Sequence, residues 1–187
     1  MEVKKYSDLR FDLLRNALYN SAREGFFALL HRMVMFVVAF AGTGAAVNLL
    51  GDEPEKLISI FAGLLVAFAA TADLVFDLGG SARVHAGLKQ RFFSLLAELE
   101  VSAGDEDELK KIQKQMTSIY GEEPPIKRVV DAIAWNQARL SNEPDVTAEQ
   151  LLRISFFQGI LQHIWAFNSA DFPLNTNEEQ KSLTKPR

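Results

Sequence analysis

Two uncharged apolar runs, separated by a short polar turn, constrain this chain more than any other feature. The first covers residues 33–50, "MVMFVVAFAGTGAAVNLL", and the second covers residues 57–72, "LISIFAGLLVAFAATA". As helices they would extend roughly 27 Å and roughly 24 Å, close to the thickness of a bilayer's hydrocarbon core. The sequence therefore predicts an all-α membrane protein with a transmembrane hairpin over residues 33–78, in which the spans cover 33–50 and 57–76 and the outer turn covers 51–56.

Two alternatives compete with the membrane hairpin. Ala39, Phe40 and Ala41 imitate a signal-peptide cleavage site, although the preceding region is long and contains too many acidic residues for a signal peptide, and the apolar run continues past the site. A soluble all-α domain could also contain such a hairpin, because a fully buried helix is apolar on every face. In a chain of 187 residues, few amphipathic helices remain to cover it.

The charges that flank the two runs predict the orientation of the hairpin. Basic residues precede the first run, and others follow the second, whereas the turn "GDEPEK" is mostly acidic. Since Lys and Arg favour the cytoplasmic side of a membrane, both chain ends are predicted to be cytoplasmic. The basic residues in question are Lys4, Lys5, Arg10, Arg15, Arg23 and Arg32 before the hairpin, and Arg83, Lys89 and Arg91 after it.

The remaining segments are predicted to be mostly helical. Residues 1–32 form an amphipathic cytoplasmic helix, and residues 79–170 form a cytoplasmic helical bundle, in which Pro124 and Pro125 separate helices over 107–120 and 126–140. Thr147 and Gln150 form a capping-box pattern before a helix over 150–167, on the membrane surface or within the bundle. Residues 171–187 are predicted to be a flexible tail.

Asp73 and Asp77 lie four residues apart at the end of the second run. On a continuous helix they would share one face, and folding the hairpin brings His31 and Arg32 to the same depth. An Arg32–Asp73 pair would clamp the two helices together at the membrane margin. The alternatives are an acidic ring of these two carboxylates at the mouth of an oligomeric pore, or a proton relay with His31.

Small residues recur at four-residue spacing within both runs, where they would let helices approach closely in lipid. Gly42 and Ala46 form such a pair in the first run, and Gly63 and Ala67 form one in the second. Packing within one hairpin and assembly of several hairpins explain this pattern equally well.

Several function classes are excluded or disfavoured by composition. The chain has no cysteine, a formal net charge of −4, and neither a phosphate-binding glycine loop nor a metal-ligand motif. We therefore expect no enzymatic activity, no cofactor, no metal and no nucleic-acid partner. Arg83 and His85, just beyond Gly79 and Gly80, are candidates for contact with a lipid headgroup or a signalling ligand, although an interhelical hydrogen bond of His85 is the simpler interpretation.

The order of these features resembles the SLATT family of two-helix membrane proteins. The resemblance covers residues 13–138 and is carried by "LLRNALYNSARE", by the hairpin, by "ADLVFDLGGSARVHAGLKQRFFSLLAELE" and by "GEEPPIKRVVDAIAWNQA". This family is associated with prokaryotic nucleotide-signalling conflict systems. The chain departs from the full arrangement of such systems, because it carries no nucleotide-sensing or nucleotide-making domain.

The resemblance implies an oligomeric effector of the bacterial inner membrane that forms a pore or perturbs the membrane in anti-phage or mobile-element conflict. The lipid bilayer, other copies of the chain, and a nucleotide signal or its sensor protein would be its partners. A non-conducting, membrane-anchored helical scaffold is the alternative function.

Overall fold

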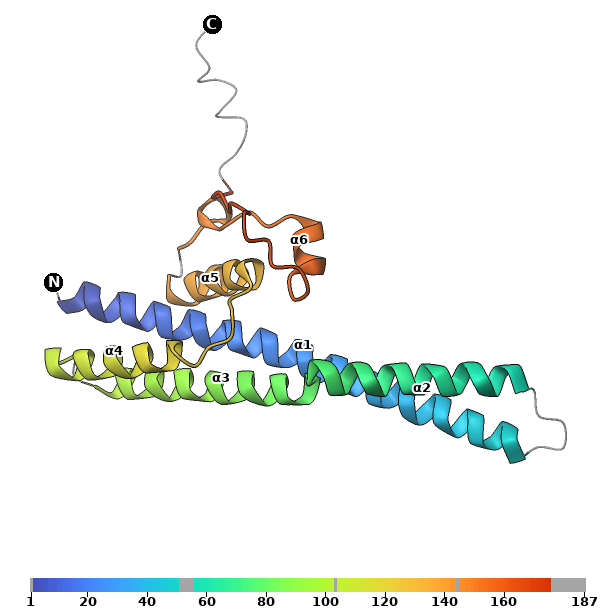
Figure 1. Cartoon of the computed structure of the whole chain (residues 1–187). Helices are drawn as coiled ribbons and strands as arrows, with labels where there is room; N and C mark the ends of the chain where they lie inside the picture. Colours follow the sequence, from blue (N-terminus) through green and yellow to red (C-terminus); the bar gives the residue numbers. More distant parts are fainter. Residues whose placement is uncertain (1, 51–55, 103, 144, 176–187) are drawn as a thin grey trace, which may run out of the picture. The chain divides into compact units, whose positions relative to one another are not determined.

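The computed structural model describes residues 2–50, 56–102, 104–143 and 145–175. This part of the chain is all-helical (Figure 1), which confirms the predicted all-α class. Its only strand-like pairing among the described residues is an isolated antiparallel bridge between Leu152 and Leu174. The elements are α1 (Glu2–Leu50), α2 (Lys56–Phe76), α3 (Leu78–Val101), α4 (Glu106–Tyr120), α5 (Arg128–Asn142), the short 3₁₀ turn η1 (Ala148–Gln150) and α6 (Phe156–Leu161).

The chain divides into two compact units. Residues 1–22 and 86–187 form the first, which we call the bundle unit. Residues 23–85 form the second, which we call the hairpin unit. Helices α1 and α3 each contribute residues to both units.

The bundle unit has an apolar core made by α1, α3 and α4. Phe92 is fully buried in this core, and apolar residues that recur at helical spacing within residues 9–17 and 88–99 supply most of its other members. Val84 precedes Leu88 by four positions, which would place it on the same helix face, yet it is about half exposed. The core residues are Leu9, Leu13, Ala17, Leu88, Phe92, Leu95, Leu96, Leu99, Leu109, Ile112, Met116 and Ile119.

Polar contacts tie α1 to the loop and helix that follow α4. The Arg15 guanidinium donates to both carboxylate oxygens of Asp131, with Nε 2.8 Å from Oδ1. The buried Asn20 amide donates to Glu123 Oε1 at 3.0 Å. Burial raises the pKa of Glu123 above its ordinary value. The first turns of α1 are therefore an integral part of the bundle unit.

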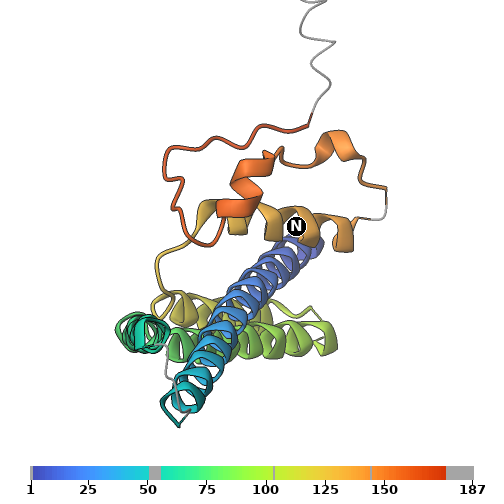
Figure 2. The same cartoon turned by 90° about the vertical axis from the view of Figure 1, so that its right-hand side faces the viewer.

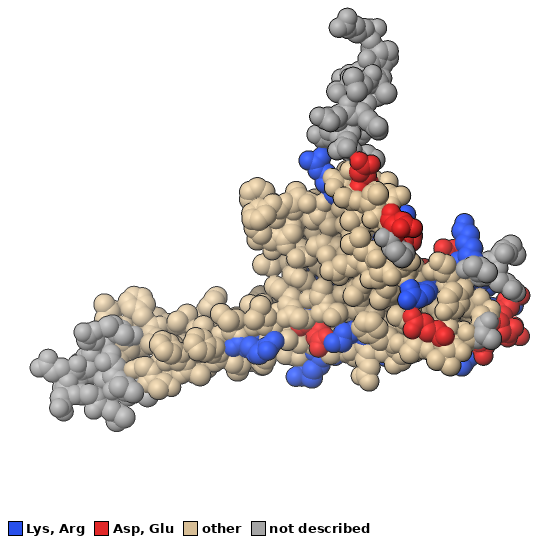
Figure 3. Space-filling view, turned by 180° about the vertical axis from the view of Figure 1, so that it is seen from behind, with Lys and Arg blue, Asp and Glu red and all other residues tan. Residues whose placement is uncertain are grey.

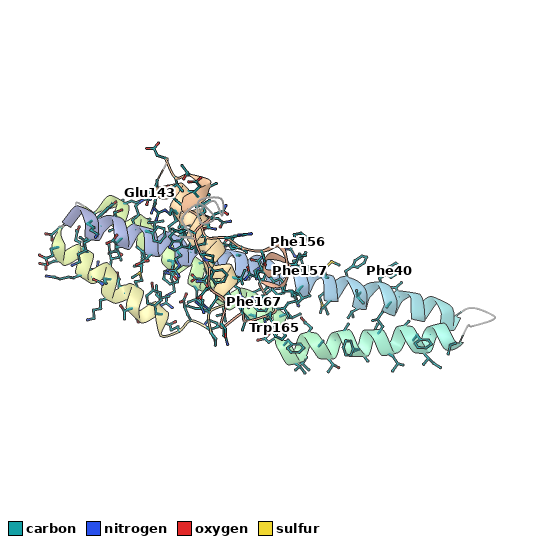
Figure 4. All side chains as sticks on the ribbon, turned by 90° about the horizontal axis from the view of Figure 1, so that it is seen from above. Phe40, Glu143, Phe156, Phe157, Trp165 and Phe167 are labelled. Atoms are coloured by element: carbon teal, nitrogen blue, oxygen red, sulfur yellow. The ribbon has the colours of Figure 1, made fainter. Side chains whose placement is uncertain are left out.

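The hairpin unit pairs α2 with the second half of α1, and the two helices run antiparallel (Figures 1 and 4). By length and composition, the described helical stretches Lys4–Gly44 and Ser59–Val101 each contain a segment able to cross a membrane. Helix α2 ends at Phe76, the predicted end of the second span. The predicted outer turn lies outside the described residues, except for Lys56, which begins α2.

The predicted helix over residues 150–167 is wrong. The Thr147–Gln150 capping box forms, but it caps only the 3₁₀ turn Ala148–Gln150. A second capping box, between Ser155 and Gln158, then starts the six-residue helix α6. Between these two caps the backbone is extended, because its amide groups bond elsewhere: the Arg153 N–H donates to the Pro173 carbonyl at 2.8 Å.

The end of the described chain also differs from the prediction. The sequence predicts a flexible tail from residue 171 onward, yet the Asn175 N–H donates to the Leu151 carbonyl at 2.8 Å, beside the Leu152–Leu174 bridge. Figure 2 shows the segment of residues 145–175 looping beside α5. The Asn136 side chain holds it there through both the N–H and the carbonyl of Leu152. The rest of the predicted tail, residues 176–187, lies outside the described residues.

Candidate functional site

Apart from the charged residues of the turn 51–56, the ionisable residues of the hairpin unit gather at one end of its helices. No charged residue occurs in residues 33–50 or 57–72, and the described face of this region in Figure 3 is correspondingly tan. The polar end is therefore the candidate functional site of this unit. Its ionisable residues are Arg23, Glu24, His31, Arg32, Asp73, Asp77, Arg83 and His85.

His31 joins the two helices of the hairpin at this end. Its Nδ1 lies 2.9 Å from Oδ1 of Asp73, and both side chains are partly buried. The sequence predicts Arg32 as the partner of Asp73, but Arg32 is exposed and its Nε donates to the Ala28 carbonyl of its own helix at 3.1 Å. Successive residues point about 100° apart around a helix, so only one of His31 and Arg32 can face α2.

Asp77 interrupts the helix that the sequence predicts to be continuous. Its φ is +42°, α2 ends just before it, and α3 begins just after it. Asp77 Oδ1 accepts a hydrogen bond from the Gly80 N–H at 3.0 Å, so Asp77 caps the N-terminus of α3. The prediction that Asp73 and Asp77 share one face of a single helix is therefore wrong.

Gly80 is the residue that this cap requires. A Cβ atom added at Gly80 would overlap the Asp77 carboxylate. Asp is also one of the few residues besides glycine that tolerates a positive φ. The sequence signal was present as Asp77 followed three residues later by Gly80, but the surrounding apolar residues favoured a continuous helix.

The structure contains an aromatic stack between α1 and α3 that was not predicted from the sequence. The Phe27 and His85 rings are stacked, with centroids 5.7 Å apart and an interplanar angle of 12°. The Arg23 guanidinium carbon lies 4.6 Å from the centroid of the Phe27 ring, within cation–π range. Arg23 and His85 are both buried. Burial, and then the charge of Arg23, lower the pKa of His85 from 6.5 to about 4, so its imidazole is neutral at neutral pH.

The burial of His85 leaves only Arg83 accessible for the predicted contact with a lipid headgroup or a signalling ligand. Arg83 is exposed, whereas His85 is 3% exposed, so the two side chains do not form one surface. They lie two positions apart on a helix and point about 200° apart. Spacing could have revealed this, because His85 precedes the core residues Leu88 and Phe92 by three and seven positions.

At Gly42, Gly63 and Ala67, the small residues of the two runs mark no close contact among the residues that the structure describes. A Cβ added at Gly42 or at Gly63 would meet no atom within 4 Å, and Ala67 is exposed. The side chain of Ala46, the fourth residue of the predicted set, lies outside the described residues. The helix faces at Gly42, Gly63 and Ala67 are therefore open to contact with another molecule.

The polar end of the hairpin unit can hold α1 to α2 and to α3, and it places charged side chains at one end of an apolar helical hairpin. Within the described residues, no group of three His, Asp or Glu side chains is placed to hold a metal ion. The His31–Asp73 contact is a hydrogen bond when the imidazole is neutral and an ion pair when it is protonated. In comparisons with protein-family models, curated proteins and solved structures, no match to this chain was found.

Proposed function

We propose that this chain is an integral membrane protein whose hairpin unit inserts into a lipid bilayer. One observation supports this most strongly: the hairpin exposes its large apolar side chains and buries polar ones. Phe40 is 74% exposed and Phe68 is 75% exposed, whereas Arg23 and His85 are buried. The only buried hydrophobic residues of the hairpin unit, among those described, are Ala69 and Leu78.

The energetic argument follows from that distribution. Apolar surface left in water forgoes about 25 cal/mol for every Å² that could have been buried, and soluble monomers rarely leave large continuous patches exposed. Lipid chains remove this penalty. The large apolar residues exposed in the hairpin unit are Leu29, Leu30, Met33, Met35, Phe36, Phe40, Leu57, Ile60, Phe61, Leu64, Leu65, Phe68, Leu74, Val75, Phe76 and Val84.

The dimensions and charges of the hairpin agree with a bilayer. Helix α2 has 21 residues and so extends roughly 32 Å, enough to cross a hydrocarbon core. The exposed Arg32 and Arg83 lie at the polar end of the unit, which favours placing that end, with both chain ends, in the cytoplasm. In this placement the His31–Asp73 contact lies at the membrane margin, where a charged side chain costs less than at the bilayer centre.

We further propose that several hairpins assemble in the bacterial inner membrane and perturb it. The open faces at Gly42 and Gly63 support assembly, because backbones can approach closely where no side chain intervenes. Perturbation would then come from the assembled apolar helices rather than from a ring of acids. Asp73 already contacts His31, and Asp77 already caps α3.

The second candidate function is a non-conducting scaffold, in which the hairpin only anchors the bundle unit. The engagement of both carboxylates within one chain favours it, since neither is left to line a pore. The two functions share the membrane hairpin and differ in what happens to the membrane potential.

The experiment expresses the full chain in bacteria and measures membrane potential with a voltage-sensitive dye, together with extraction of the protein from membranes by alkaline carbonate. We expect resistance to extraction, and depolarisation that is lost in Gly42→Leu. Gly44→Leu is the matched control, because Gly44 is equally open but points about 200° away from Gly42. Retention in the membrane without depolarisation would favour the scaffold, and extraction by carbonate would contradict both functions.

A further inference from the structure

A second apolar surface lies in the bundle unit, on and just after α6. Phe156, Phe157, Ile160, Ile164 and Trp165 are between 58% and 78% exposed. We call these five residues, with the less exposed Leu161, the α6 apolar face. Figure 4 shows Phe156, Phe157 and Trp165 on this segment. It is a dense group of large apolar side chains for a surface that faces only water.

These side chains form one continuous surface because the helical turn extends beyond α6. The N–H groups of Ile164 and Trp165 both donate to the Leu161 carbonyl, at 3.0 and 2.9 Å, so a helical turn follows α6. Residues four apart therefore lie one above the other. One row contains Phe156, Ile160 and Ile164, and the neighbouring row contains Phe157, Leu161 and Trp165.

The polar side chains of the same segment are the less exposed ones. The Gln158 side chain bonds back to Ser155, where its Oε1 accepts from the Ser155 N–H at 2.8 Å. Gln158, Gln162 and His163 are only partly exposed. The segment thus presents its apolar residues outward and its polar residues inward, the same inversion that the hairpin unit shows.

The α6 apolar face is held in place by the start of α5. Lys127 Nζ donates to the Ile164 carbonyl at 3.1 Å, and Arg128 Nη1 donates to the Asn168 carbonyl at 2.5 Å. The Arg128 guanidinium also lies 6.0 Å from the ring centroid of Phe172. The segment is therefore a supported surface rather than a loose loop.

The α6 segment itself carries no acidic residue, although Glu149 and Asp171 flank it in the sequence. Residues 151–170 contain Arg153 and no Asp or Glu, and Lys127 and Arg128 lie in contact with the segment. From this charge, and from the exposed aromatic and aliphatic side chains, we propose that the α6 apolar face docks onto the surface of a bilayer with anionic headgroups. Trp and Phe enter the headgroup region readily, and nearby basic side chains add electrostatic attraction. This inference rests on the proposed function, because the α6 apolar face can dock onto a bilayer only if the hairpin unit holds the protein at one.

The chain supplies its own reporter for this contact. It has two tryptophans, Trp135 and Trp165, and neither lies in the hairpin unit. Trp135 packs edge-to-face against Phe11 in the bundle unit, with ring centroids 5.9 Å apart. In Trp135→Phe the emission comes from Trp165 alone, and in Trp165→Phe it comes from Trp135 alone.

The test reconstitutes the full-length chain into vesicles of phosphatidylcholine and phosphatidylglycerol whose lipids are brominated near the top of the acyl chain. We expect bromine to quench Trp165 and shift its emission to shorter wavelength, while Trp135 is unaffected. The Trp165 quenching should weaken in pure phosphatidylcholine and after Phe156→Ser with Phe157→Ser. Phe93→Ser, which removes an exposed Phe from α3, should leave it unchanged.

Two results would overturn the proposal. Quenching of Trp165 by aqueous iodide but not by bromine would place the α6 apolar face in water. Protection from both quenchers would show that protein covers it, either a second copy or another partner. Insertion of the hairpin is measured separately, by carbonate extraction of the same vesicles. Extraction of the protein by carbonate would contradict the proposed function, whereas the quenching of Trp165 decides whether the α6 apolar face docks onto the bilayer.

Discussion

The imidazole Nδ1 of His31 lies 2.9 Å from Oδ1 of Asp73, so that α1 and α2 are joined by a polar contact between partly buried side chains. This contact explains why the apolar helix α2 carries Asp73 near its end: the carboxylate bonds to His31 on the neighbouring helix. A carboxylate at this depth without a partner would oppose membrane insertion.

We predict that His31 and Asp73 are energetically coupled. Interhelical hydrogen bonds in membranes contribute about 0.6 kcal/mol on average and up to about 1.7 kcal/mol. Thermal unfolding in detergent of His31→Ala, Asp73→Ala and the double variant should show losses that are less than additive by about this amount. Arg32→Ala should change stability little. Fully additive losses would mean that the contact contributes nothing.

Asp77 is predicted to act as a helix cap rather than as a charge. Loss of a capping side chain costs about 1 kcal/mol, and Asn caps as well as Asp does. Asp77→Ala should therefore destabilise the detergent-solubilised protein, whereas Asp77→Asn should not. Gly80→Ala should cost a similar amount, because the new Cβ displaces the capping carboxylate, and should add little to Asp77→Ala. Equal destabilisation by Asn and Ala would instead assign the role to the charge.

The parts of the fold that the sequence predicts correctly are those with a strong periodic or compositional signal. The predicted spans end at residues 50 and 76, and helices α1 and α2 end at Leu50 and Phe76. The helices α4 and α5 begin and end within two residues of their predicted bounds, because Pro124 and Pro125 separate them. Membrane insertion, orientation, assembly and the resemblance to the SLATT family stay predictions.

Local capping chemistry explains most of the differences. At Asp77 and at Ser155, a side chain bonds a backbone N–H three residues on and starts a new helix where apolar content alone favoured a longer one. Asp73 bonds to His31 and not to Arg32 because of the way α1 is rotated about its axis relative to α2. Residue spacing within one helix does not predict that rotation. The Phe27–His85 stack likewise depends on two helices distant in sequence.

His85 is predicted to make the protein less stable in acid. Its pKa is about 4 in the folded protein, against 6.5 for an accessible histidine, so the unfolded chain binds a proton more readily. The stabilisation from neutral His85 is fully present above about pH 6.5 and is lost as the pH falls toward about 4, by an amount on the order of 2 kcal/mol. His85→Phe keeps the stack with Phe27 and should show a smaller loss of melting temperature over that range. Identical pH profiles for the two proteins would contradict the depressed pKa.

Two phenylalanines in different environments should respond differently to truncation. Phe92 is fully buried in the bundle core, so Phe92→Ala should lower stability by about 3–5 kcal/mol. Phe68 is exposed in the hairpin, so Phe68→Ala removes no packing within the chain and should change unfolding in detergent by less than about 1 kcal/mol. Denaturant or thermal unfolding of the bundle, followed by circular dichroism, measures both. A large effect of Phe68→Ala would show that the hairpin packs against protein.

The measurement that tests the membrane hairpin most directly uses spin labels on single cysteines, which this cysteine-free chain accepts without removing any native thiol. Labels at Phe40→Cys and Phe68→Cys are compared with one at Lys110→Cys on α4, in vesicles, by their collisions with oxygen and with a water-soluble nickel complex. We predict high oxygen and low nickel accessibility at residues 40 and 68, and the reverse at residue 110. Nickel accessibility at residues 40 and 68, or protection from both agents, would place the hairpin in water or inside protein and contradict the account.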